Sequence, residues 1–178
     1  MMLKILLVAL LSAVASIINI PVGESGFRVS AGIVVMVVLI IVWKMPRIML
    51  TSLISGIAVC LMRVLIDSFS VPMTLTLAGN YLLEVFFYLG YGLIYLLTVV
   101  RNRSIYKTPL VVSLVLSDVG GNAIEYFLRF IAAEEVWQNT SLNAILLAAV
   151  ARSVVIILLV WLYEITLGKA DLKEETAG

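Results

Sequence analysis

The residues of this chain best suited to chemistry are four polar side chains within one otherwise apolar stretch. They follow one another at intervals of four, three and four residues: Asp118, Asn122, Glu125 and Arg129. Because an α-helix turns once every 3.6 residues, this spacing places all four on one helix face. Gly120 and Gly121 lie beside the stripe and would let a neighbouring backbone or a ligand approach closely. The pattern predicts a polar wall that faces a ligand or another helix.

Other apolar stretches carry ionisable residues that are expected at matching depths. Arg63 and Asp67 are four residues apart, and Arg152 stands near the middle of the last stretch. One helical face of the stretch 77–100 begins polar and becomes aromatic, with the members Asn80, Glu84, Tyr88, Tyr91 and Tyr95. Three arginines balance three carboxylates, which predicts a buried cluster whose charges cancel. Charges within membrane spans are costly and usually functional.

Composition identifies the environment in which these side chains must be positioned. Hydrophobic residues make up 63% of the 178 residues and charged ones 13%, which excludes an ordinary soluble domain. Long apolar runs satisfy their backbone polar groups in lipid only as helices. Six spans are expected, at Leu3–Ile20, Val29–Trp43, Ile48–Ile66, Leu77–Val100, Leu110–Ile131 and Leu142–Leu167. The predicted fold is an all-α integral membrane protein, with a six-helix domain over 1–168 and a charged cytoplasmic tail over 169–178.

The basic residues in the loops between the spans and at the chain ends predict how the protein is oriented in the membrane. One side holds eight of them: Lys4, Lys44, Arg47, Arg101, Arg103, Lys107, Lys169 and Lys173. The opposite side holds only Arg28, together with Glu24, Glu134 and Glu135. Because Lys and Arg are retained on the cytoplasmic side, both termini are expected inside the cell. The charged residues of the spans then lie from mid-membrane outward.

The residue inventory argues against catalysis. The chain has no His, which removes the usual imidazole base and the commonest metal ligand. No metal-ligand spacing and no phosphate-binding glycine loop is present, so neither a metal nor a cofactor is expected. Gly90 and Gly92 lie in an apolar helix, where close packing explains them. Cys60 is a small packing residue without a partner for a disulfide, and no basic surface is available for nucleic acid.

Several motifs resemble known families of membrane modules. Six spans in under 200 residues, with Ala9-x-x-x-Ala13 in the first helix, resemble the substrate-binding S components of energy-coupling-factor vitamin transporters. The run FRVSAG at 27–32, the Arg63 to Asp67 pair and the Asp118 to Arg129 stripe resemble the six-span input regions of Firmicute sensor histidine kinases. The first resemblance implies a coupling subunit that binds at Ala9 and Ala13. The second implies a kinase, supplied by a partner or a longer parent chain.

Together these observations predict a non-catalytic module in the cytoplasmic membrane of a bacterium that binds a small polar or zwitterionic ligand from the outside. The expected binding residues are Arg63, Glu84, Tyr88, Tyr91, Asp118, Asn122, Glu125, Arg129 and Arg152. Binding of the ligand would either be reported to a partner as a signal or lead to uptake of the ligand. Two alternatives stay open. The charges could simply be ion pairs that hold helices together, and the architecture also resembles the rod-shape-determining membrane protein of cell-wall elongation, which is a scaffold.

Overall fold

The computed structural model describes residues 1–21, 28–70, 72, 74–101, 108–132 and 141–166. Within them the chain forms six α-helices, one π-helical turn and one two-stranded hairpin. The elements are α1 (Met2–Ala15), β1 (Asn19–Pro21), β2 (Arg28–Ser30), α2 (Ala31–Val42), α3 (Ile48–Ser68), α4 (Leu75–Tyr95), η1 (Leu96–Val100), α5 (Leu110–Ile131) and α6 (Leu142–Thr166). The predicted all-helical class is confirmed for these residues. The tail 169–178 and the loop residues Glu24, Glu134 and Glu135 lie outside them.

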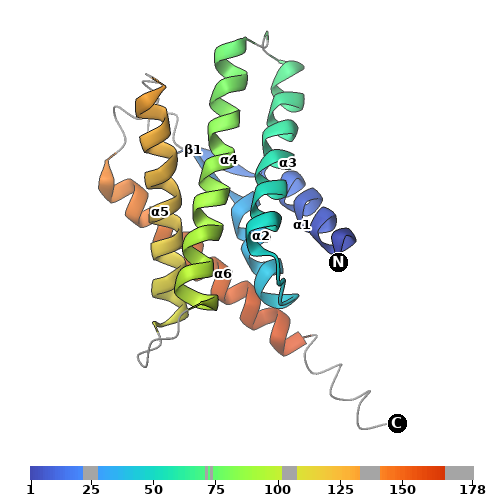
Figure 1. Ribbon diagram of the computed structural model, residues 1–178, viewed down its shortest axis with the longest axis vertical. Coiled ribbons are helices and arrows are strands. Elements are labelled where there is room, and N and C mark those ends of the chain that lie inside the picture. The colour runs from blue at the N-terminus through green and yellow to red at the C-terminus, as the bar shows by residue number, and fades with distance from the viewer. Residues whose placement is uncertain (22–27, 71, 73, 102–107, 133–140, 167–178) are drawn as a thin grey trace.

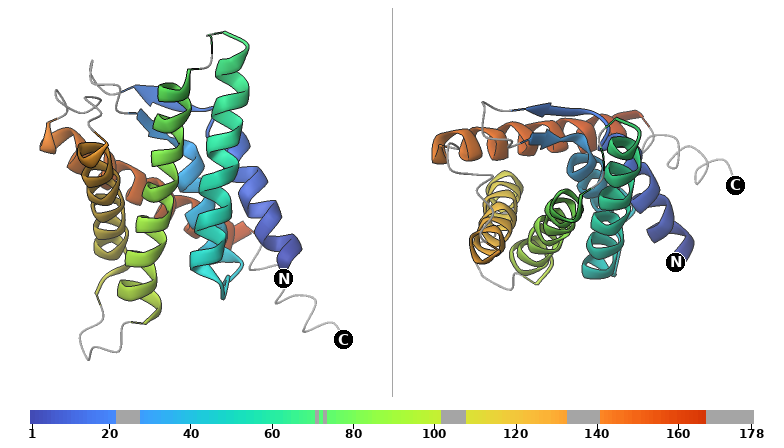
Figure 2. Two further views of the ribbon diagram at one scale, coloured as in Figure 1. Left: turned by 45° about the horizontal axis from the view of Figure 1, so that its top comes forward. Right: turned by 90° about the horizontal axis from the view of Figure 1, so that it is seen from above.

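The helices form two layers. Figure 1 shows α3, α4 and α5 side by side, running alternately up and down, and α4 packs extensively against both neighbours. Seen from above in Figure 2, α2 and α6 lie behind this row, α6 crosses it obliquely, and α1 lies at its α3 end. α6 contacts α5 and α2, α2 contacts α1, and α1 contacts α3. The six helices therefore enclose a common interior.

Four helical segments of the described chain are long and apolar enough to cross a membrane: Ile48–Ser68, Leu77–Val100, Leu110–Ile131 and Leu142–Thr166. The first two helices are shorter than the predicted spans, with 14 residues in α1 and 12 in α2. At 1.5 Å per residue they reach about 21 and 18 Å, less than the roughly 30 Å of a hydrocarbon core. Six full-length spans are thus not observed. No residue of α2 is exposed, so α2 is an enclosed core helix rather than a lipid-facing span.

A β-hairpin, which the sequence did not predict, occupies the joint between α1 and α2. Its register pairs Asn19 with Ser30, Ile20 with Val29 and Pro21 with Arg28. Pro21 has no amide hydrogen and favours extended backbone at Ile20, so no helix can continue through it, and the chain leaves the helix before it, at Ala15. The side chain of Ser30 then caps α2 by accepting a hydrogen bond from the Gly32 amide at 3.2 Å.

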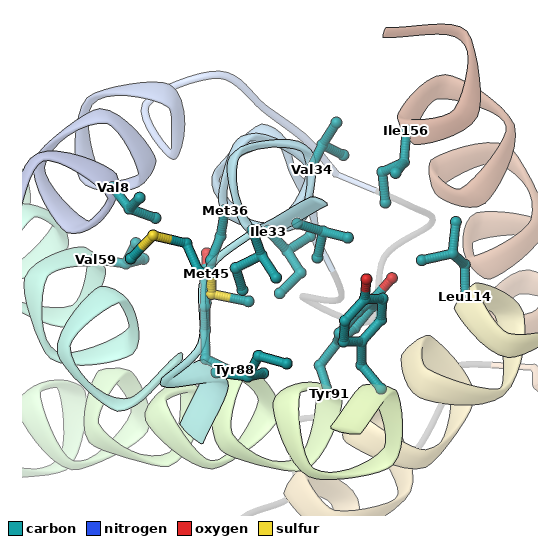
Figure 3. Packing of buried hydrophobic residues seen from close by; sticks show 14 of the residues in the cluster. Val8, Ile33, Val34, Met36, Met45, Val59, Tyr88, Tyr91, Leu114 and Ile156 are labelled. Atoms are coloured by element: carbon teal, nitrogen blue, oxygen red, sulfur yellow. The ribbon is translucent and has the colours of Figure 1, made fainter. Parts of the chain in front are cut away.

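The apolar core surrounds α2 (Figure 3). Ile33, Val34 and Met36 of α2 are buried at its centre. Each of the other helices contributes to the same cluster, with Val8 from α1, Val59 from α3, Tyr88 and Tyr91 from α4, Leu114 from α5, and Ile156 from α6. A helix that is apolar all round belongs in a core or in lipid, and no residue of α2 is fully exposed. The core therefore accounts for the position of α2.

Polar and apolar side chains are distributed in the opposite way to a soluble protein. The outer surfaces expose large aliphatic and aromatic side chains, among them Leu3, Leu61, Phe127, Leu147 and Trp161. Buried positions include Ser12, Ser117 and Ser153, whose hydroxyls each donate to a carbonyl of their own helix at 2.7 Å. Extensive exposed apolar surface around a partly polar interior is typical of helices packed in lipid. The protein is accordingly a membrane protein.

Glycines bring α4 close to both of its neighbours. A Cβ atom on Gly121 of α5 would lie 2.9 Å from the carbonyl oxygen of Phe87 and 3.1 Å from the amide nitrogen of Tyr91. On the other side of α4, a Cβ on Gly56 of α3 would lie 3.2 Å from the Cα of Val85. Gly90 and Gly92 also lie against side chains of α5 and α3, which confirms close packing as their role. These contacts fix the spacing of the helices that carry the charged residues.

Candidate functional site

The polar stripe of α5 faces the interior of the bundle, as its spacing predicted. Asp118, Asn122, Glu125 and Arg129 are 1%, 3%, 5% and 7% exposed, respectively. The neighbouring Gly121 is approached by the backbone of α4, so the close approach foreseen for this glycine is made by a helix. Because α5 packs against both α4 and α6, its stripe meets charged residues from each of them.

Asp118 and Arg152 form the deepest ion pair of the cluster. The Nη2 atom of Arg152 lies 2.8 Å from Oδ1 of Asp118, which also accepts a hydrogen bond from Asn122 Nδ2 at 2.8 Å. The guanidinium of Arg152 lies over the ring of Phe87, 5.3 Å from its centroid. Arg152 is 4% exposed, so the pair is shielded from water. This pair links α5 to α6, and the cation–π contact adds α4.

Glu125 and Arg129 form the local pair expected from their spacing on α5. Nε and Nη2 of Arg129 both donate to Oε1 of Glu125, at 2.9 and 2.6 Å. The same guanidinium reaches α4, where Nη1 donates to the side-chain oxygen of Asn80 at 3.4 Å and Nη2 to its carbonyl oxygen at 3.1 Å. Arg129 is therefore held from two sides.

Arg63 pairs across helices rather than along its own. Its Nη1 atom lies 2.9 Å from Oε1 of Glu84 on α4. The i,i+4 spacing of Arg63 and Asp67 had suggested a local pair, but Asp67 instead accepts a hydrogen bond from the hydroxyl of Tyr81. The reason is that α4 packs along α3 and brings Glu84 and Tyr81 to that face. A partner on another helix cannot be read from spacing within one helix.

Two of the three ion pairs, Glu125–Arg129 and Arg63–Glu84, lie close enough together for their charges to interact. Glu125 lies close enough to Glu84 and Arg63 to interact with the charges of both. Three guanidinium groups and three carboxylates lie together on α3, α4, α5 and α6, and their formal charges cancel. Two of the ion pairs join residues of different helices at one level of the bundle, and the depth of the cluster in a membrane stays a prediction. Buried charges are tolerated when they are paired and hydrogen-bonded, so the cluster satisfies the basic condition for existing inside a membrane protein.

Several buried polar atoms of the cluster nevertheless have no partner within the described part of the chain. They are Nε and Nη2 of Arg63, Nε of Arg152, Oδ2 of Asp118 and the hydroxyl of Tyr91. Both donors and acceptors are represented. Because native proteins leave few buried polar atoms unpaired, such atoms indicate places where water, an ion or a ligand contributes the missing contacts.

The aromatic residues of α4 belong to the apolar core. Tyr88 and Tyr91 are 2% and 1% exposed, and Phe87 meets each of them edge to face, with ring centroids 5.7 and 6.3 Å apart. Figure 3 shows both tyrosines pointing from α4 toward α2. Tyr95, 6% exposed, joins the same cluster. Their observed contacts are core packing, and ligand contact by Tyr88 and Tyr91 stays a prediction.

The small-residue pair of the first helix is buried within the chain itself. Ala9 and Ala13 are each 3% exposed, on the face of α1 that packs against the rest of the bundle. The protein's own helices cover these two alanines, and their contact with a coupling subunit stays a prediction. The exposed face of α1 instead carries large aliphatic side chains such as Leu3, Leu6 and Leu10.

Two contributors to the cluster were absent from the predicted binding residues. Phe87 supports Arg152, although it lies off the polar face of α4 that the spacing defined. Asn80 was placed on that face, but its contact with Arg129 became visible only with the packing of α4 on α5. The described residues contain no group of His, Cys, Asp and Glu arranged to hold a metal ion. Comparisons with family models, curated proteins and solved structures find no match to the chain.

Proposed function

We propose that this protein binds a small polar or zwitterionic ligand in its charged cluster and passes occupancy on, as signal or as uptake. One observation carries the proposal: the cluster has spare buried hydrogen-bonding atoms of both kinds, donors on Arg63 and Arg152 and an acceptor on Asp118. A ligand with an anionic and a cationic group would satisfy both kinds at once. Such a ligand would also leave the balance of charge unchanged.

The proposed role is non-catalytic. The cluster contains carboxylates and guanidinium groups held in ion pairs, and the chain has no His to act as a base. Ion-paired groups of this kind are suited to recognising complementary charges. The ligand would arrive from the outer side. A kinase would receive the signal, or a coupling subunit would complete the transporter. An adjacent gene for a response regulator would favour sensing, and adjacent genes for an ATPase pair would favour uptake.

Binding should be visible as ligand-induced stabilisation. The melting temperature of purified protein in detergent would be measured with a panel of amino acids, betaines and small dicarboxylates. We expect at least one zwitterionic solute to raise it saturably, since a ligand at 100 times its Kd adds about 2.7 kcal/mol. The exposed Arg101→Met variant should respond like the wild type. The double variant Arg152→Met/Asp118→Leu should fold but respond less. A panel without any effect on the wild type would remove the support for this function.

A bacterial inner-membrane orientation with both ends in the cytoplasm is part of the proposal. The described basic residues Lys4, Lys44, Arg47 and Arg101 are exposed and belong to helix ends or joints at the lower end of the bundle in Figure 1. Lys and Arg are retained on the cytoplasmic side, so this end would face the cytoplasm. The charged cluster would then lie between mid-membrane and the outer surface.

Cysteine labelling on the two ends of α3 tests this orientation. In a Cys60→Ala background, Ser70→Cys should react with a membrane-impermeant maleimide in intact cells, and Arg47→Cys should react only after lysis. Both positions are exposed, so accessibility within the protein does not bias the comparison. Lysed cells supply the control for reactivity. Labelling of Arg47→Cys, but not Ser70→Cys, in intact cells would show that the protein has the opposite orientation in the membrane.

An interaction scaffold is the second candidate. The observation that favours it is the pairing itself: each arginine of the cluster has a carboxylate partner, so the charges can serve purely to hold α3, α4, α5 and α6 together. A scaffold would co-purify with a membrane partner and would not be stabilised by solutes. The same thermal measurements, combined with cross-linking in native membranes, separate the two functions.

A further inference from the structure

One guanidinium edge in the cluster is left open. Arg63 contacts Glu84 through Nη1 at 2.9 Å, while its Nε and Nη2 atoms are buried and have no partner among the described residues. Nε and Nη2 lie on one side of a guanidinium group and point their hydrogens in nearly parallel directions. Arg63 is 9% exposed, so this edge is shielded from bulk water. The open edge is therefore a costly feature that an external partner would relieve.

The other two arginines of the cluster show how the chain normally satisfies this edge. Arg129 directs both Nε and Nη2 at Oε1 of Glu125, at 2.9 and 2.6 Å. Arg152 uses Nη2 for Asp118 at 2.8 Å and leaves only Nε spare. Among these three residues, Arg63 alone keeps the whole edge available within the described structure. Arg129 and Arg152 thus use this edge, fully or in part, for ion pairs within the helix bundle.

The surroundings of Arg63 hold this edge in place. The ion pair with Glu84 fixes the opposite corner of the guanidinium group. Asp67, the nearest carboxylate along α3, is engaged by Tyr81. A fork of two parallel N–H groups that is already fixed loses little entropy when it binds, and it matches the two oxygens of a carboxylate or a phosphate.

We propose that the Nε–Nη2 edge of Arg63 binds the oxyanion of a zwitterionic ligand, a carboxylate or a phosphate that carries its own cationic group. This inference rests on the proposed function and narrows it. The ion pairs of the cluster already cancel in charge, so a bare anion would introduce an uncompensated negative charge. A zwitterion avoids this cost. Two sources have this chemistry: amino-acid-like solutes and the headgroups of zwitterionic phospholipids.

The Arg63 Nε–H resonance provides a direct test. Protein labelled with ¹⁵N-arginine would be studied in a phosphate-free maltoside detergent, and the resonance of Arg63 identified by its loss in Arg63→Lys. Glycine and glycerophosphocholine are the two zwitterionic probes, acetate is the bare anion, and glycinamide is the matched control without a carboxylate. We expect a saturable downfield shift with at least one zwitterion, a weaker response to acetate and none to glycinamide.

The two zwitterionic probes distinguish the sources. A response to glycine alone supports a solute, and a response to glycerophosphocholine alone supports a lipid headgroup. Arg63→Lys keeps the positive charge beside Glu84 but loses the fork, so probe affinity, followed by thermal shift, should fall roughly tenfold or more. Equal probe affinity in the wild type and in Arg63→Lys would overturn the site. An Arg63 resonance of the wild type that does not respond to any probe would overturn it too. This second result does not depend on whether the variant folds.

Failure of this site and failure of the proposed function have different signatures. If other solutes raise the melting temperature of the wild type while the Arg63 resonance stays unchanged, ligand binding holds and the open edge is occupied only by water. If no solute changes either measurement, both proposals are wrong. In that case the cluster is structural.

Discussion

Replacing Arg152 with Met is expected to lower the free energy of unfolding by about 3–5 kcal/mol, because the change leaves a buried carboxylate without its cation. Asp118 is 1% exposed and would keep only the hydrogen bond from Asn122. The contact of the guanidinium with Phe87 would also be lost. Unfolding of the purified protein by titration with a denaturing detergent, followed by circular dichroism, measures this difference.

A second change separates the cost of an orphaned charge from the value of the pair. Arg152→Met with Asp118→Leu removes both charges and should recover most of the lost stability, since a buried ion pair contributes little compared with apolar residues of similar size. Arg101→Met removes an exposed arginine and serves as the matched control, with an expected change near zero. If Arg152→Met alone were as stable as the wild type, water would have to reach Asp118. The described burial of the pair would then be wrong.

Gly121→Ala is expected to lower the free energy of unfolding by about 1–3 kcal/mol, although alanine favours helices over glycine. The added Cβ would meet the carbonyl oxygen of Phe87 at 2.9 Å and the amide nitrogen of Tyr91 at 3.1 Å. These are backbone atoms, so they can yield only if α4 and α5 move apart. Such movement would also weaken the contact between Arg129 and Asn80. The same detergent titration measures the effect.

Gly79 of α4 offers a matched control for this substitution. A Cβ at Gly79 would meet nothing within 4 Å, so Gly79→Ala should show only the intrinsic preference for alanine. We expect a gain of up to about 1 kcal/mol. The two variants make the same chemical change and should move stability in opposite directions. Equal effects in both would mean that α4 and α5 do not cross at Gly121.

These expectations assign different roles to the three arginines of the cluster. Arg129 directs both Nε and Nη2 at Glu125, and Arg152 directs Nη2 at Asp118, so both arginines pair with carboxylates of α5 and stabilise the bundle. Arg63 is anchored at one corner and keeps its fork open. A cluster that is mostly structural can therefore still contain a binding group. Mutation of Arg152 and mutation of Arg63 should affect stability and binding in different proportions.

The sequence by itself determined the class of protein, the long helices and the polar stripe. These are local properties, because apolar length and the 3.6-residue period act within one segment. The boundaries of Leu110–Ile131 were predicted correctly, and so was the burial of Asp118 and its neighbours on one face. The i,i+4 pair of Glu125 with Arg129 was equally visible, since both partners belong to the same helix.

Only the tertiary structure decided the enclosure of α2, the hairpin between α1 and α2, and the partners of the charges across helices. The order and rotation of packed helices depend on contacts between residues far apart in sequence. The periodicity of one helix carries no information about these contacts. Arg63 illustrates the difference: its spacing suggested Asp67, but the packing of α3 on α4 supplies Glu84. That packing also leaves one edge of the guanidinium open. Spacing located the charges, and helix packing determined which of them are already paired.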